Sequence, residues 1–133
     1  MTRQAAKKFC EITGIPNYLV RAIASEFRMI FIRLYAFLPF QNYKIKSISS
    51  ANKQINIIFG CGCTSYSEWV GIDCFFSKSV DFVLDLRRKL PFKNESVDLC
   101  YSEHFIEHLH QNEVTQHLNE VFRILKPGGR YRV

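Results

Sequence analysis

The sequence predicts an α/β fold, a Rossmann-like parallel sheet with an N-terminal helical extension. Three observations carry this prediction. After residue 54, short apolar runs alternate with loops and a helical segment, which is typical of a parallel sheet with crossover connections. The first run ends in the glycine turn Gly60-Cys61-Gly62. Before residue 55, apolar positions instead recur every three or four residues, as in an amphipathic helix.

Residues 1–54 are predicted to form a helical, basic extension. After Pro16, one apolar stripe recurs at helical spacing and comprises Leu19, Ile23, Phe27, Ile30, Leu34 and Leu38. The helix is expected to end near Pro39, and residues 41–54 to join the two parts because their apolar content falls. We favour packing of the stripe against the chain's own domain; peripheral membrane contact through residues 17–40 stays open.

The net charge of +6 belongs to the extension. Residues 1–53 hold nine Lys/Arg and two acids (9 − 2 = +7), and residues 54–133 hold nine basic and ten acidic groups (9 − 10 = −1). A basic segment either binds anionic lipid or an acidic substrate, or forms a solvent-exposed surface without a partner. Binding to a specific nucleic acid is not predicted.

The location predicted from the sequence is cytoplasmic, with membrane association left open. No convincing signal peptide precedes the apolar stretch, and the twelve residues Met29–Phe40 are too short to span a bilayer. The five cysteines, an odd number without framework spacing, are expected to be reduced. Cys61-x-Cys63 lacks a second pair at zinc-like spacing, so no metal is predicted.

Four strands are predicted at Ile55–Phe59, Trp69–Ile72, Asp81–Leu86 and Val97–Ser102, and a fifth begins at Tyr131–Val133. A helix carrying Val114, Leu118, Val121, Phe122 and Leu125 precedes it and is expected to stop at residues 126–129. Right-handed crossovers then give the strand order 3-2-1-4-5. Candidate site residues fall where strands end, and ligands bind at the carboxyl ends of parallel strands.

The glycine turn predicts a nucleotide-like cofactor. Glycines let backbone N–H groups approach a ligand, and an acid ending the next strand accepts from ribose hydroxyls. Asp73 follows Gly62 by eleven positions, against about twenty in the dinucleotide fingerprint. The spacing therefore argues against a nicotinamide enzyme and leaves room for one or two helical turns at most.

Residues 55–133 resemble the class I S-adenosylmethionine-dependent methyltransferases of the type 11 kind. The segments that carry the resemblance are Gly60-Cys61-Gly62, Trp69-Val-Gly-Ile-Asp73, Asp85-Leu86 with Leu90-Pro91-Phe92, Val97–Ser102, and the helix that ends at Glu120–Arg130. The resemblance implies S-adenosyl-L-methionine as cofactor and methylation of a small-molecule, lipid or glycan acceptor.

The resemblance also implies roles for individual residues. The backbone of Gly60, Cys61 and Gly62 would pass the methionine moiety, and Asp73 would hold the ribose. Asp85 would accept from the adenine amino group, with Leu86 against the ring. Ser102 and Glu103 would lie beside the sulfonium, and His104 would face the acceptor as the catalytic candidate.

The family sheet continues beyond strand five, so the sequence predicts a domain truncated after that strand begins. An unpaired strand-five edge is expected to favour self-association. A cofactor-binding or inactive methyltransferase-like protein therefore stays open as an alternative.

A minor alternative is a zinc hydrolase. His104-Phe105-Ile106-Glu107-His108 matches the His-x-x-Glu-His pattern, in which two histidines on one helical face bind zinc. A third ligand would come from Glu113, His117 or Glu120. Under the methyltransferase interpretation, His110 and His117 are expected at the surface.

Overall fold

The computed structural model describes residues 3–50 and 54–133. The chain divides into two compact units, Met1–Phe31 and Ile32–Val133. The division predicted at residues 54–55 stays a prediction, and residues 51–53 of the predicted connection lie outside the described part.

Three helices make up the N-terminal region: α1 (Arg3–Thr13), α2 (Asn17–Ala36) and α3 (Pro39–Ser50). Gly14 ends α1 with a φ of 69° and donates its N–H to the Cys10 carbonyl, as expected for a glycine after a helix. Pro39 opens α3, where its missing N–H costs no hydrogen bond. None of the described helices combines the length and apolar character needed to cross a bilayer.

The prediction that residues 41–54 form a connection is wrong for residues 41–50, which continue α3. The segment is mostly polar, but a helix needs only one apolar stripe to pack. Ile45 is buried in the core cluster of the sheet unit, and Ile48 packs against that cluster. These two residues supply the stripe, so low apolar content did not exclude a helix.

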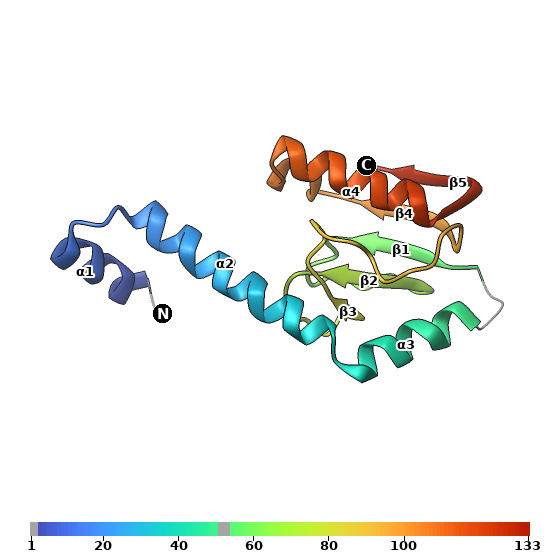
Figure 1. Cartoon of the computed structure of the whole chain (residues 1–133), viewed down its shortest axis with the longest axis horizontal. Coiled ribbons are helices and arrows are strands. Elements are labelled where there is room, and N and C mark those ends of the chain that lie inside the picture. Colours follow the sequence, from blue (N-terminus) through green and yellow to red (C-terminus); the bar gives the residue numbers. More distant parts are fainter. Residues whose placement is uncertain (1–2, 51–53) are drawn as a thin grey trace. The chain divides into compact units, whose positions relative to one another are not determined.

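Five strands form one parallel sheet: β1 (Asn56–Phe59), β2 (Trp69–Asp73), β3 (Phe82–Val83), β4 (Val97–Ser102) and β5 (Leu125–Arg132). Their order is β3-β2-β1-β4-β5 (Figure 1). Ile57 pairs with Val70 on one side and with Cys100 on the other, both in parallel register. The predicted fold class and strand order are confirmed.

Strand five starts earlier than predicted. Helix α4 (Gln111–Ile124) passes directly into β5, where Leu125 pairs with Val97 and Arg130 with Leu99. Residues 126–129 therefore loop out between two paired positions. A Cβ on Gly129 would lie 2.9 Å from the Lys126 carbonyl oxygen, so this turn needs glycine. The Lys-Pro-Gly-Gly segment bends the strand; it does not precede it.

The core lies on the sheet face that carries Ile57 and Phe59. Residues paired across a parallel sheet share a face, and Phe59 pairs with Ile72 and Ser102. Helix α4 covers this face with His117, Val121 and Ile124, all at most 2% exposed. The connections at residues 60–68 and 74–81 contain turns but no helix, within the predicted limit of two helical turns.

Candidate functional site

The glycine turn follows β1 at the carboxyl edge of the sheet. Gly60 and Gly62 have φ values of 68° and 56°, which side chains other than glycine rarely adopt. Gly60 donates its N–H to the Ile72 carbonyl at 2.9 Å and lies directly under Phe105. At Gly62, by contrast, an added Cβ would meet nothing within 4 Å. The backbone at Gly62 is therefore open to a ligand.

Asp73 joins this turn to the end of β2. Its Oδ2 accepts the Gly62 N–H at 2.8 Å, and its Oδ1 accepts the Cys74 N–H at 2.6 Å. The residue is 6% exposed. The structure thus brings the predicted ribose acid into direct hydrogen-bond contact with the predicted methionine-binding turn.

The cysteine between the two glycines points inward. Cys61 is buried, and its thiol donates to the Ser79 carbonyl at 3.7 Å. Burial and the negative charge of Asp73 raise the pKa of Cys61 to about 11, so the thiol stays neutral and unreactive at neutral pH. Cys61 contributes to this site through its backbone.

Asp85, the predicted adenine acceptor, is enclosed by two arginines. Its Oδ2 accepts from Arg33 Nε at 2.8 Å, and its Oδ1 accepts from Arg87 Nε at 2.9 Å and from the Arg87 N–H at 3.1 Å. Arg87 also contacts Glu113 at 3.3 Å. Burial alone would raise the pKa of Asp85, but hydrogen bonds from Arg87 and Arg33 outweigh it and lower the pKa. Both carboxylate oxygens are therefore engaged within the chain.

Ser102 belongs to a buried chain of hydrogen bonds. Its Oγ lies 2.8 Å from Tyr131 Oη, which lies 3.3 Å from His117 Nε2. His117 Nδ1 lies 3.1 Å from the Leu86 carbonyl oxygen. Because a carbonyl only accepts, Nδ1 carries the proton and Nε2 accepts from Tyr131. Tyr131 in turn accepts from Ser102, so each of the three hydrogen bonds in this network has an assigned donor and acceptor.

Two of the predicted site residues turn their side chains into the core and not toward a ligand. Ser102 is 1% exposed and Leu86 is 3% exposed, so both side chains lie in the core. Only the backbone of Ser102 remains for a ligand. The expectation that His117 lies at the surface is wrong, because His117 is fully buried; His110 is exposed as expected.

The segment after β4 is exposed. Glu103 accepts from Tyr101 Oη at 2.9 Å. His104 has a φ of 52°, its side chain is 84% exposed, and its Nδ1 lies 3.1 Å from Glu107 Oε1. The 3₁₀ helix η1 (Ile106–His108) is a single turn that excludes His104. The two histidines of the zinc pattern therefore do not share an α-helical face, and the described residues hold no group of three metal-ligand side chains.

Four functional neighbours were missed in the sequence. Arg33 and Arg87 donate to Asp85, Tyr131 accepts from Ser102, and His117 accepts from Tyr131. His117 precedes Val121 and Ile124 by four and seven positions, so helical periodicity could have placed it on the buried stripe. Arg33 lies 52 residues before Asp85, and no local pattern signals that contact.

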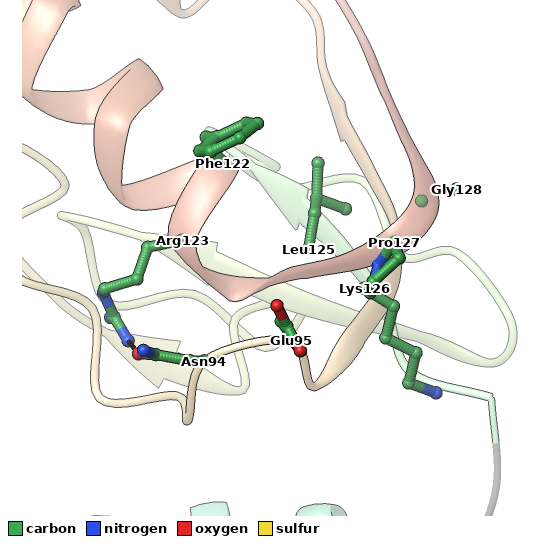
Figure 2. Close-up of a pocket in the computed structure, with 9 residues that line it drawn as sticks. Asn94, Glu95, Phe122, Arg123, Leu125, Lys126, Pro127 and Gly128 are labelled. Atoms are coloured by element: carbon green, nitrogen blue, oxygen red, sulfur yellow. Dashed lines mark hydrogen bonds between the residues drawn. The ribbon is translucent and has the colours of Figure 1, made fainter.

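A cavity of about 590 Å³ lies elsewhere, at the amino end of β5 (Figure 2). Its two cations already have partners: Arg123 donates to Asn94 Oδ1 at 3.0 Å, and Lys126 lies 2.8 Å from Asp98. Parallel strands bind ligands at their carboxyl ends. We therefore place the candidate site at the glycine turn and not in this cavity.

Comparisons with known proteins found one matching family model and similar solved structures. Residues 73–133 match a family model described as a methyltransferase domain. A solved structure from Methanococcus maripaludis, described as a candidate S-adenosyl-L-methionine-dependent methyltransferase, is 19% identical with a TM-score of 0.46. That alignment covers 96% of the present chain and 61% of the other chain. No curated protein matches.

The parallel sheet with order β3-β2-β1-β4-β5 and a glycine turn after β1 defines the class as a Rossmann-like α/β fold. Residues 73–133 are thus similar to a methyltransferase domain family. The family implies S-adenosyl-L-methionine as cofactor. The open backbone at Gly62 and the carboxylate of Asp73 beside it fit that group.

Proposed function

We propose that this protein transfers a methyl group from S-adenosyl-L-methionine to a small-molecule, lipid or glycan acceptor. The observation that carries the proposal is the 2.8 Å bond between the Gly62 N–H and Asp73 Oδ2. It joins the ends of β1 and β2 at the edge where α/β sheets bind nucleotides. The remaining lone pairs of Asp73 are the acceptors that ribose hydroxyls require.

The cofactor supplies a methyl group made electrophilic by a positive sulfur, so the protein mainly binds and aligns the reactants. In this proposal, the backbone of Gly60, Cys61 and Gly62 binds the methionine moiety. The Ser102 hydroxyl holds the ends of β4 and β5 together through Tyr131. His104 is exposed beside Glu107, and we assign it to the acceptor side of the site.

The Asp85 role needs a rearrangement. Each of its oxygens has two lone pairs, and each already accepts two hydrogen bonds from Arg33 or Arg87. We propose that one of these four hydrogen bonds gives way when Asp85 accepts from the adenine amino group. Leu86 follows Asp85 and is buried, and its contact with the adenine ring remains part of the proposal.

The first test is calorimetric titration of the full chain with S-adenosyl-L-methionine. Asp73→Ala is expected to weaken binding by about 1–3 kcal/mol, the cost of removing a charged acceptor. Glu95→Gln removes an exposed carboxylate at the opposite edge of the sheet and serves as the matched control. Equal affinities for the wild type and Asp73→Ala would remove Asp73 from the ribose role, and tighter binding of NAD would refute the cofactor.

The second test separates an enzyme from a cofactor-binding protein. Transfer of a labelled methyl group to panels of small molecules, lipids and glycans is expected for the wild type, and His104→Ala is expected to lower the rate more than cofactor affinity. Binding without transfer to any acceptor would favour the binding protein. We propose a cytoplasmic location, supported by five free cysteines, which are typical of reducing compartments.

A further inference from the structure

The cavity at the amino end of β5 lies at the sheet edge opposite the glycine turn, and the cofactor proposal does not use it. This α4–β5 cavity holds about 590 Å³, a volume within the usual range of small-molecule sites. Its walls come from the last turn of α4, the start of β5 and the residues just before β4 (Figure 2). All of these segments belong to the Ile32–Val133 unit.

Backbone hydrogen bonds fix the wall that precedes β4. The Glu95 N–H donates to the Arg123 carbonyl at 3.0 Å, and the Ser96 N–H donates to the Ile124 carbonyl at 2.8 Å. Glu95 is held with a φ of 51°, which is uncommon for residues other than glycine. These bonds tie Glu95 to the junction of α4 and β5, so its side chain starts from a fixed point in the cavity wall.

The two cations that line the α4–β5 cavity are already neutralised by other residues. The Arg123 guanidinium has five N–H donors, and all five bond within the chain, two of them to the Glu120 carboxylate. Lys126 Nζ lies 2.8 Å from both carboxylate oxygens of Asp98. Each lining cation therefore has one carboxylate of its own.

The Glu95 carboxylate is the charge that these pairs leave over. Within residues 3–50 and 54–133, no donor forms a hydrogen bond or ion pair with it. The same cavity is lined by the apolar side chains of Phe122, which is 83% exposed, Leu125 and Pro127. An unpaired acid and an aromatic ring in one cavity match a ligand that carries a positive charge on an apolar body. An anion would instead meet Glu95 and find both cations bonded.

We propose that the α4–β5 cavity binds a small organic ammonium ion with an aromatic or alkyl body. The ammonium group donates to the Glu95 carboxylate, and the body covers Phe122 and Leu125. Burial of the exposed ring supplies the apolar part of the affinity, and the carboxylate selects a cation over a neutral compound of the same shape. Because the glycine turn lies at the other edge of the sheet, the proposal does not depend on cofactor binding or methyl transfer.

Two compounds that differ only in charge test the role of the carboxylate. Phenethylammonium is the probe, and 2-phenylethanol has the same phenyl and ethyl groups with a neutral hydroxyl. Ligand-observed NMR titrations of the full chain at neutral pH measure both dissociation constants. The wild type is expected to bind phenethylammonium about fivefold more tightly, which is the size of one exposed ion pair. This preference should shrink as salt is raised.

Variants of the lining separate the charge from the apolar surface. Glu95→Gln should bring the two dissociation constants together and leave the value for 2-phenylethanol unchanged. Phe122→Ser should weaken both compounds by about fivefold, because it removes the ring that the apolar body covers. Circular dichroism checks that both variants keep their helices.

Two matched controls lie outside the cavity and should leave both dissociation constants unchanged. Glu68→Gln removes an exposed carboxylate just before β2 from a residue that also has a positive φ, of 64°. Phe75→Ser removes a phenyl ring that is 51% exposed and follows β2.

Equal affinity of the wild type for the two compounds would overturn the proposal, and so would a preference for the cation that survives Glu95→Gln. Affinities that Phe122→Ser leaves unchanged would place the compounds elsewhere on the surface and would equally overturn it. A titration of the wild type with phenethylammonium that does not saturate would have the same consequence.

Discussion

The carboxylate of Asp85 provides the sharpest test of how the Ile32–Val133 unit is held together. Its side chain is 2% exposed, and it accepts from Arg33 at 2.8 Å and from Arg87 at 2.9 Å. Removing one partner of a buried ion pair costs about 3–5 kcal/mol. The arginine side chains keep 30% and 20% exposure, so water compensates them in part. We therefore expect Asp85→Asn to lower the free energy of unfolding by about 2–4 kcal/mol.

Urea denaturation of the full chain at neutral pH measures this loss, with Asp81→Asn as the matched control. Asp81 pairs with Lys44 at 2.9 Å, but these side chains are 40% and 47% exposed. Exposed ion pairs contribute about 0–1 kcal/mol. Both substitutions keep a carbonyl acceptor, so the difference between them reports the burial of the charge. Equal losses for the two variants would refute the reasoning.

The pH dependence of the same pair follows from the direction of the shift. The pKa of Asp85 is below its ordinary value of 3.8, because the hydrogen bonds from Arg87 and Arg33 outweigh the effect of burial. Its contribution is therefore fully present above about pH 4 and is lost as the pH falls through the folded-state pKa. The stability difference between the wild type and Asp85→Asn should narrow below about pH 4; a constant difference down to the acid limit would contradict this assignment.

Three further predictions concern the core and the glycine turn. Burial lowers the pKa of His117 below 6.5, and this effect outweighs the opposite effect of its hydrogen bond to the Leu86 carbonyl. The free energy of unfolding should therefore fall as the pH drops below about 6.5. In urea titrations at several pH values, His117→Gln should remove this pH dependence. Gly71→Ala would place a Cβ 2.4 Å from the Ser79 carbonyl oxygen and should destabilise by about 1–3 kcal/mol in thermal unfolding; an unchanged midpoint would show that the loop yields freely. Iodoacetamide should alkylate exposed Cys63 well before Cys61, whose pKa is raised to about 11, and peptide mass spectrometry that found equal rates would contradict the burial of Cys61.

The strands and their order could be predicted because their signals are local. Short apolar runs such as Ile57–Phe59 are buried on both faces of a parallel sheet and therefore need no alternation. The glycine turn and Asp73 could be predicted as neighbours, since strand ends of a parallel sheet meet at one edge. Their hydrogen bond places both at the carboxyl edge of the sheet.

The bounds of helices and strands were harder to predict where the segment is mostly polar or rich in glycine. Residues 41–50 contain few apolar residues, yet Ile45 and Ile48 lie one turn apart and suffice to pack α3. Residues 126–129 have the composition of a helix stop, but Leu125 already pairs with β4. A single sequence does not distinguish a turn before a strand from a turn within one, because both need the same glycine conformations.

The sequence by itself determined the sheet, the strand order and the residues at the carboxyl ends of β1, β2 and β4, since these follow from apolar runs and turn chemistry along the chain. It placed the end of β3 three residues too late, at Leu86 instead of Val83. Only the tertiary structure decided which groups form hydrogen bonds with the side chains of those residues. Arg33 contacts Asp85 from 52 residues away, and Tyr131 contacts Ser102 from 29 residues away. Periodicity in α2 likewise shows that one helix face is apolar but not what covers that face.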